Sequence, residues 1–328
     1  MRTFLKFIVL LAVAMALWFY WAALLPVNPG ETKFVQLLPG WSSRHIAQTL
    51  QQAGIIRSAS AFLIVHYVKG QGSLKAGEYK FEVPANTLQV RERVLHGDVF
   101  TRTVVVPEGY NLYDIAAAVE QAGLGSATEF VAAAQRDVSL IRDIDPQAQS
   151  LEGYLFPDTY QFTGIDTAHE IAAAMVHRFR RTAQKIGLVG SPDIHRVVTI
   201  ASIVEKETAE PDERPLVASV YDNRLERNMA LAADPTVIYA ALLNGRYRGT
   251  IYQSDLQFDS AYNTYRYPGL PPGPIANPGV ASLEAAMHPA QSEFLYFVSD
   301  GNGHHRFSRS MEEHAKNVAA YRKAEAGH

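Results

Sequence analysis

A short segment near the middle of the chain carries the side chains best suited to acid–base chemistry. Residues 193–208 read as a helix that is apolar up to its last turn, where Glu205 and Glu207 flank Lys206. On a helical wheel both glutamates fall at the margins of the apolar stripe, so either carboxyl would be partly desolvated. Desolvation raises the pKa of a carboxyl toward neutrality, where it can protonate a leaving oxygen. The wheel does not choose between the two, and a plain alternative is an exposed helix end whose glutamates pair with Lys206 or Arg214.

Other classes of site are not indicated by the sequence. It holds no cysteine, which removes disulfides, thiolate nucleophiles and cysteine-ligated metals. It contains no G-x-S-x-G, P-loop, H-E-x-x-H or dinucleotide-binding fingerprint. His304-His305 with His314 is the densest histidine group, but a carboxylate at ligand spacing is missing, so we expect neither a metal nor a cofactor. The net charge of −3 argues against a general nucleic-acid binder.

An internal repeat organises the first half of the chain. Residues 39–55 recur as residues 108–124, and in each copy a Gly turn leads into a short amphipathic helix. Ser42 and Asn111 are the expected N-caps of these helices. The strand-like runs that precede the two copies are 34–38 and 103–106. Such a unit is typical of small LysM-like carbohydrate-binding modules, although it is also a common building block.

The remaining elements follow from periodicity and turn residues. Further helices are predicted at 88–95, 127–135, 168–186 and 213–227, and strands at 76–84 and 294–299. The Pro-rich stretch 268–274 cannot be helical, because proline fixes φ and removes hydrogen-bond donors. Aromatic residues and an apolar strand flank it, which favours an ordered loop packed on the domain over a linker.

The first residues read as a membrane anchor. Arg2 and Lys6 are the only charges before Pro26, and the uncharged run 7–25 would form a helix about 28 Å long, near the ~30 Å of a bilayer core. A cleaved signal peptide is the alternative, but bulky aromatics and no small-x-small site end the run. The positive-inside rule places the N-terminus in the cytoplasm and the rest outside the inner membrane.

Together these patterns predict an α+β protein in three parts. Residues 1–26 would be a cytoplasmic tip and transmembrane helix, residues 27–103 a small LysM-like α/β module, and residues 104–328 a larger mixed α+β catalytic domain. The chain of 328 residues is long enough for two folded units outside the anchor.

Residues 201–208, followed by Glu213-Arg214, resemble the signature of the endolytic murein transglycosylase family, also called YceG-like. The similarity extends in the family's order through 76–79, 152–160, 217–225, 234–239, 262–265, 269–279 and 295–298. Two departures occur: Ala232-Ala233 stand where the family usually has Gln-Thr, and His304-His305 where it often has Gly-Gly-His. They put fine substrate contacts in doubt but not the reaction.

The resemblance implies cleavage of the bond between N-acetylmuramic acid and N-acetylglucosamine inside a peptidoglycan strand. Glu207 matches the family's catalytic acid, which would protonate the glycosidic oxygen and then act as base on the muramoyl 6-hydroxyl. That hydroxyl attacks the anomeric carbon and leaves a 1,6-anhydro end, so one carboxyl suffices. The expected substrate-binding residues are Asp234, Tyr262, Asn263 and Tyr265. Their plain alternatives are turn caps for Asp234 and Asn263 and core packing for the tyrosines.

The resemblance also implies a membrane-tethered enzyme that cuts nascent strands and terminates their elongation, with peptidoglycan synthases as hypothetical partners. Two other functions remain open at this point. A lysozyme-like hydrolase would use Glu205 or Asp234 as the second carboxylate that such chemistry needs. A scaffold that binds glycan without cleaving it would retain the fold but not the activity.

Overall fold

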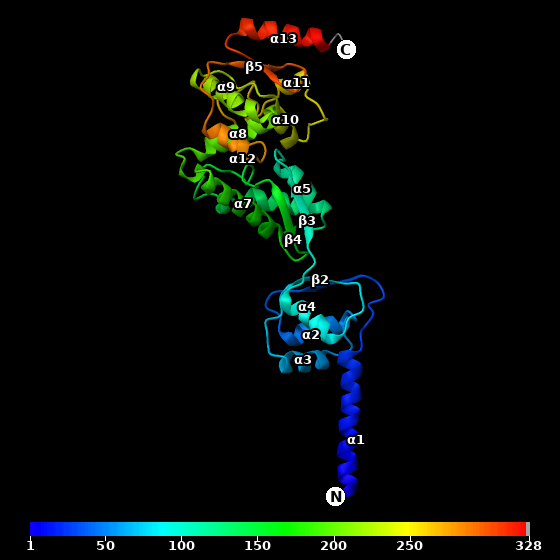
Figure 1. The fold of residues 1–328 in the computed structure, drawn as a ribbon. Coiled ribbons are helices and arrows are strands. Elements are labelled where there is room, and N and C mark those ends of the chain that lie inside the picture. The colour runs from blue at the N-terminus through cyan, green and yellow to red at the C-terminus, as the bar shows by residue number, and fades with distance from the viewer. Residues whose placement is uncertain (326–328) are drawn as a thin grey trace. The chain divides into compact units, whose positions relative to one another are not determined.

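The computed structural model describes residues 1–325, which form two compact units (Figure 1). The first unit comprises residues 1–103 and 161–166, and the second comprises residues 104–160 and the chain from 167 onward. Both units mix helices with short two-stranded sheets, so the prediction of an α+β protein is confirmed.

The first unit begins with a long apolar helix. Helix α1 (Arg2–Phe19) continues into a π-helical turn, η1 (Tyr20–Leu24). Among residues 1–325 this 23-residue stretch is the one helix long and apolar enough to cross a membrane. No residue of α1 is buried, whereas Ala22 and Ala23 at its far end are buried against the rest of the unit.

A small α/β body follows the apolar helix. Its elements are β1 (Lys33–Leu37), α2 (Ser43–Gln52), α3 (Ala59–Val68), β2 (Gly77–Phe81) and α4 (Thr87–His96). The two strands pair antiparallel, with Lys33 opposite Phe81 and Leu37 opposite Gly77. The predicted strands at 34–38 and 76–84 and the helix at 88–95 are therefore confirmed, while α3 was not predicted.

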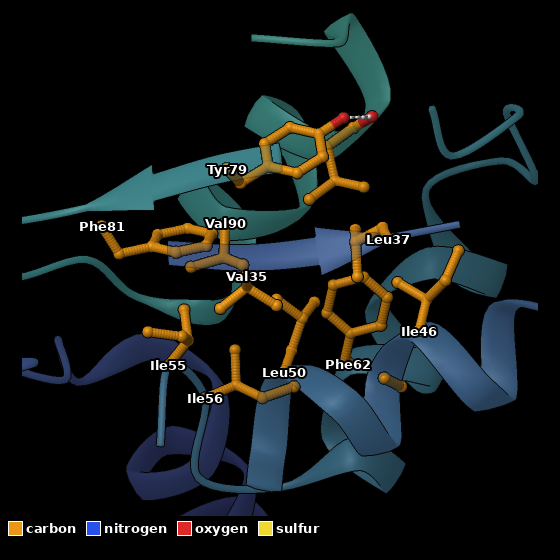
Figure 2. Close-up of a cluster of buried hydrophobic side chains, with 12 residues drawn as sticks. Val35, Leu37, Ile46, Leu50, Ile55, Ile56, Phe62, Tyr79, Phe81 and Val90 are labelled. Atoms are coloured by element: carbon orange, nitrogen blue, oxygen red, sulfur yellow. Dashed lines mark hydrogen bonds between the residues drawn. The ribbon is translucent and has the colours of Figure 1, made fainter. Parts of the chain in front are cut away.

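The core of this body lies between the sheet and the helices. Strand alternation turns Val35 and Leu37 toward Leu50 of α2 and Phe62 of α3 (Figure 2). All four side chains are at most 4% exposed, and burying each contributes about 1.5–3 kcal/mol. Tyr79 is buried as well and donates its hydroxyl hydrogen to the carbonyl of Lys75 at 2.9 Å.

Both copies of the repeat start their helices as predicted. The Ser42 hydroxyl accepts the His45 N–H at 3.3 Å at the start of α2. In the second unit the Asn111 side chain accepts two backbone N–H groups at the start of α5 (Leu112–Gln121). These caps satisfy donors that the first turn of a helix leaves free.

The second unit is mostly helical. Its elements are β3 (Arg102–Val106), α5, α6 (Ala127–Arg136), β4 (Asp158–Phe162), α7 (Ala168–Lys185), α8 (Ile194–Glu207), α9 (Arg214–Glu226), α10 (Asp234–Leu243), α11 (Gln253–Leu256), α12 (Val280–Met287), β5 (Tyr296–Ser299), β6 (His305–Ser308) and α13 (Met311–Glu325). Strands β3 and β4 pair with each other, and β5 and β6 form an antiparallel hairpin. The predicted helices and strands agree with these bounds to within two residues at each end.

Helix α8 is the centre of this unit. It packs against α9, α10 and α12, and every residue from Val197 to Val204 is buried. The Pro-rich stretch 268–274 is not helical and carries buried residues such as Pro271 and Pro274, so its prediction as an ordered, packed loop is confirmed. Gly153 lies under it at φ +88°, where an added Cβ would stand 2.5 Å from Pro274 Cγ.

Candidate active site

Helix α8 is buried along most of its length, and its last turn carries the two candidate glutamates. The helix starts at Asp193, whose side chain accepts the Arg196 N–H at 3.0 Å. It stops after Glu207, because Thr208 adopts an extended backbone with φ −138° and ψ 134°. The two glutamates thus stand on a rigid support, within the last three residues of the helix.

Glu205 is held entirely by the protein. Its Oε1 accepts from Arg214 at 3.1 Å, its Oε2 accepts the Gly279 N–H at 2.9 Å, and its side chain is only 5% exposed. Both carboxyl oxygens of Glu205 therefore already have a donor from the protein. Glu205 thus pairs with Arg214, as the alternative predicts, but its side chain is buried and not at an exposed helix end.

Glu207 has different surroundings. Its Oε1 accepts the Tyr221 hydroxyl hydrogen at 2.6 Å. Burial is the largest cause that raises the pKa of Glu207 to about 7; the nearby Asp234 carboxylate acts in the same direction, and Tyr221 and the charge of Arg224 act against it. A carboxyl with this pKa is about half protonated near neutral pH, so it can both give and take a proton.

Glu207 opens into a cavity of about 640 Å³. One wall comes from α9 and the loop before α10, and the other from the β5–β6 hairpin and α13. The lining residues are Glu207, Tyr221, Arg224, Met229, Ala230, Leu231, Ala232, Asp234, Tyr265, Tyr296, Phe297, Met311 and His314. Aromatic faces beside a few carboxyl and guanidinium groups suit a sugar, which stacks on rings and bonds through its hydroxyls.

Arg224 is a fixed positive charge in this cavity. Its Nε donates to the Leu295 carbonyl at 2.7 Å, and its Nη1 donates to the Leu231 carbonyl at 2.6 Å. The guanidinium also lies over the Tyr296 ring, 5.2 Å from its centroid. These contacts join α9 to the β5–β6 hairpin and hold the aromatic wall beside Glu207.

Asp234 and Tyr265 form a hydrogen-bonded pair at the cavity. The Tyr265 hydroxyl donates to Asp234 Oδ1 at 2.7 Å, and both residues line the cavity with Glu207. The loop before Asp234 bends at Ala232, which has φ +46°. A non-glycine residue there costs roughly 1–2 kcal/mol, and the bend is held by two N–H bonds, from Ala232 and Ala233, to Thr264.

The structure does not bring Tyr262 and Asn263 into this cavity. Asn263 is fully buried, and its amide donates to the carbonyls of Leu256 at 3.0 Å and Phe258 at 2.8 Å. Its Oδ1 accepts the Tyr265 N–H at 3.1 Å. The Tyr262 ring packs edge-on against Tyr239 at 5.0 Å. In the structure both residues therefore support the segment that presents Tyr265.

Sequence reasoning missed most of the cavity wall. Tyr221, Arg224, Tyr296 and Phe297 all lie in segments that carry the family resemblance, but their spacing alone gives no sign that they meet. The structure brings them together: the Phe297 ring stands edge-on to Tyr221, with centroids 6.1 Å apart. Met311 and His314 come from α13, which was not predicted.

A second, smaller cavity of about 320 Å³ is also lined by Glu207. Its lining residues are Glu108, Gly109, Glu205, Lys206, Glu207, Thr208, Ala209 and Arg214. Burial raises the pKa of Glu108, and the charge of Glu205 raises it further, against the effect of Arg214. Glu207 therefore borders two cavities.

Two of the three residues in the histidine group bond the carboxylate of Glu213. His304 and His305 both bond Glu213 through Nδ1, at 3.2 and 2.7 Å. His314 stacks instead on Tyr296, with centroids 5.2 Å apart. Among residues 1–325 no three histidine, aspartate or glutamate side chains converge as metal ligands.

Comparisons with known proteins agree on one family. A model of the YceG-like family matches residues 35–320. An endolytic murein transglycosylase of Bacillus subtilis (strain 168) is 33% identical over 306 residues, covering 88% of this chain and 84% of that protein. One of Streptococcus pneumoniae (strain D39) is 30% identical over 339 residues, and the match covers 91% of this chain but 60% of that longer protein. The crystal structure of a yceG-like protein from Listeria monocytogenes is 33% identical with a TM-score of 0.58, covering 87% of this chain and 99% of that one.

Proposed function

Because the chain belongs to the YceG-like family, we infer that it is a lytic transglycosylase that cleaves peptidoglycan strands internally. The bond cut is the one between N-acetylmuramic acid and N-acetylglucosamine, and the product carries a 1,6-anhydro end. The similarity covers most of the chain, including the whole of α8 and the cavity around it.

The observation that carries this function is that Glu207 lines two cavities. A carboxyl with a pKa of about 7 borders both the larger and the smaller cavity. A glycan bound with its scissile bond at Glu207 has room for further sugars on both sides. That arrangement supports cleavage inside a strand rather than at its end.

Glu207 serves as both acid and base in the proposed reaction. The protonated carboxyl gives its proton to the glycosidic oxygen as the bond to the anomeric carbon of the muramoyl residue breaks. The resulting carboxylate then takes the proton of the muramoyl 6-hydroxyl while that oxygen bonds to the anomeric carbon. No water is consumed, and Glu207 ends the cycle protonated again.

Other residues of the cavity orient the sugars. We assign substrate contacts to Asp234 and Tyr265, because both line the cavity and their mutual hydrogen bond fixes them. The negative charge of Asp234 also suits the positive charge that develops on the anomeric carbon. For Tyr262 and Asn263 we propose a positioning role through Tyr265, since Asn263 bonds the backbone of that residue.

The test compares two glutamine variants on purified sacculi. Glu207→Gln keeps the shape of the side chain and removes its proton, so release of anhydro-muropeptides should stop. Glu226→Gln changes an exposed glutamate at the end of α9 and should leave release unchanged. Unchanged release by the Glu207 variant would refute the assignment.

Mass spectrometry of the released fragments separates the alternatives. Anhydro ends are lighter than hydrolysed ends by one water, about 18 Da. Glu205 is already bound by Arg214 and Gly279, so a hydrolase would have to use Asp234 as its second carboxylate. Reducing ends would support hydrolysis, and no fragments from the unaltered protein would support a scaffold.

We also propose the domain roles expected from the sequence, with residues 27–103 as a LysM-like module and residues 104–328 as the catalytic domain. The strand–helix–helix–strand order of β1, α2, α3 and β2 supports the first role. So does a cavity of about 630 Å³ beside the Gly turn and the start of α2, lined by Trp41, Ser42 and Arg44 among others. Weaker retention of Glu207→Gln protein on sacculi after Trp41→Ala would support glycan binding by this module, and unchanged retention would count against it.

Residues 2–24 are proposed to anchor the enzyme in the inner membrane with the N-terminus in the cytoplasm. The support is the length of the apolar helix, the basic Arg2 and Lys6 at one end, and Trp18 and Trp21 near the other. Protease protection of an N-terminal tag in spheroplasts tests this orientation, and digestion of the tag would refute it.

An anchored enzyme would act next to newly made strands, so peptidoglycan synthases are the proposed partners. Co-purification of the full-length protein from crosslinked membranes tests this partnership, and reproducible absence of any synthase would count against it.

A further inference from the structure

Helix α3 carries apolar side chains on its exposed face as well as on its buried face. Apart from Ser60 and the buried His66, all its residues from Ala59 to Val68 are apolar. One face, with Phe62 and Val65, packs into the first unit. A helix that is apolar all round is normally buried on every side, in a protein core or in a membrane.

The other face of α3 has no cover within the described chain. The Ile64 side chain is 43% exposed, Tyr67 is 53% exposed and Val68 is 80% exposed. Ile64 and Val68 are four residues apart, so they stand above one another on the same face of the helix. Ile64 and Val68 form an apolar patch, whereas Tyr67 borders the cavity near the start of α2. Lys69 follows the patch directly at the end of the helix.

The patch lies next to the end of the proposed membrane span. Ala61 and Val65 of α3 pack against Ala22 and Ala23, the last buried residues of the apolar helix. Figure 1 shows α3 beside the point where α1 ends. An element packed on the last turn of a span is held at the level of the lipid headgroups.

Arg57 fastens the start of α3 to that same end. Its guanidinium donates to the Leu25 carbonyl and, at 2.8 Å, to the Pro26 carbonyl, and it lies over the Trp21 ring at 5.6 Å. Arg57 also donates to the Trp21 carbonyl at 3.4 Å, and carbonyls in the last turn of a helix lack a partner within it. The link leaves α3 little freedom to move away from the end of the span.

From this geometry we propose that α3 lies in the membrane interface and inserts the patch of Ile64 and Val68 into the lipid surface. Amphipathic helices bind in this way with their apolar face about 5–10 Å into the boundary of headgroups and acyl chains. The basic Arg57 and Lys69 at the two ends suit anionic headgroups. The inference rests on the proposed membrane anchoring, and it assigns the first unit a second contact with the bilayer.

The absence of cysteine from the sequence makes the contact directly measurable. Val68→Cys and Ile64→Cys introduce single labelling sites on the patch. Phe34→Cys is the matched control, because Phe34 is 47% exposed but points to the side of β1 opposite the buried Val35 and Leu37. Each full-length variant carries an environment-sensitive fluorophore and is reconstituted in vesicles of phosphatidylethanolamine and phosphatidylglycerol.

At positions 64 and 68 we expect blue-shifted emission and quenching by lipid-borne spin labels that is several-fold stronger than at position 34. Aqueous iodide should quench in the reverse order. Equal iodide access at all three positions would overturn the proposal. So would a blue shift that grows with protein density and resists lipid quenchers, because it would mean that a second protein copy covers the patch.

The same preparations separate this inference from the proposed function. Normal release of anhydro-muropeptides with positions 64 and 68 in water would refute the interfacial helix and leave the enzyme assignment intact. Lipid-exposed labels in a protein that releases no fragments would support the interfacial helix and refute the enzyme assignment.

Discussion

The hydrogen bond from Tyr221 to Glu207 sets how strong an acid Glu207 is. The Tyr221 hydroxyl donates to the carboxylate at 2.6 Å, so it stabilises the ionised form and lowers the pKa of Glu207. Tyr221→Phe removes only the hydroxyl from a ring that is 1% exposed. Its loss should raise the pKa of Glu207 above its value of about 7.

The size of the change follows from the bond that is lost. A hydrogen bond to a charged group contributes about 1.5–3 kcal/mol, and one pKa unit corresponds to about 1.4 kcal/mol. Removing it should therefore raise the pKa by about one to two units, from about 7 to about 8 or 9.

The pH dependence of kcat/KM on soluble glycan strands reports this shift. Because Glu207 must be protonated to donate, kcat/KM should fall above pH 7 in the unaltered enzyme and only above about pH 8 or 9 in Tyr221→Phe. Tyr267→Phe is the control, since it loses an equivalent hydroxyl bond to the exposed Asp259, away from the cavity. A falling limb that stays in place or moves to lower pH in Tyr221→Phe would refute the reasoning.

Two further predictions concern stability. Gly153→Ala should lower the free energy of unfolding by about 2–5 kcal/mol in urea titrations, because a Cβ there combines a φ of +88° with a 2.5 Å approach to Pro274. Gly245→Ala, with positive φ but nothing within 4 Å, should cost only about 1–2 kcal/mol, and equal losses would show that the close approach is irrelevant. The bond to Asp145 raises the pKa of His195, against the effect of burial. This stabilisation is complete below the unfolded pKa of about 6.5 and is lost as pH rises through the higher folded value. The free energy of unfolding should therefore fall with rising pH in this range, and His195→Gln should reduce that fall. An unchanged pH dependence in the variant would assign it to another group.

Local features of the fold were predictable because their causes lie close together in the sequence. Ser42, Asn111 and Asp193 cap their helices through N–H groups two or three residues away. Asp234–Leu243 was not predicted to be helical, because its start depends on the bend at Ala232. That bend is held by Thr264, which is 32 residues away in the chain.

The same distinction applies to the candidate site. The helical pattern identified two candidate glutamates, and the family resemblance selected Glu207. The physical difference between them appears only in the fold, where Arg214 and Gly279 bond Glu205 and Tyr221 bonds Glu207. Asn263 illustrates the opposite case. A polar residue flanked by tyrosines suggests sugar binding. In the structure, however, the side-chain amide of Asn263 donates its hydrogen bonds to backbone carbonyls.

The place of Glu207 at the very end of α8 has one more consequence. The aligned peptide dipoles of a helix leave a partial negative charge at its C-terminal end, and a carboxylate placed there is repelled. This repulsion comes from the main chain and does not depend on excluding water from the cavity. It favours the protonated form of Glu207 while the cavity is still open to solvent. A substantial fraction of the proposed general acid is therefore already protonated before the glycan binds, without any closing movement.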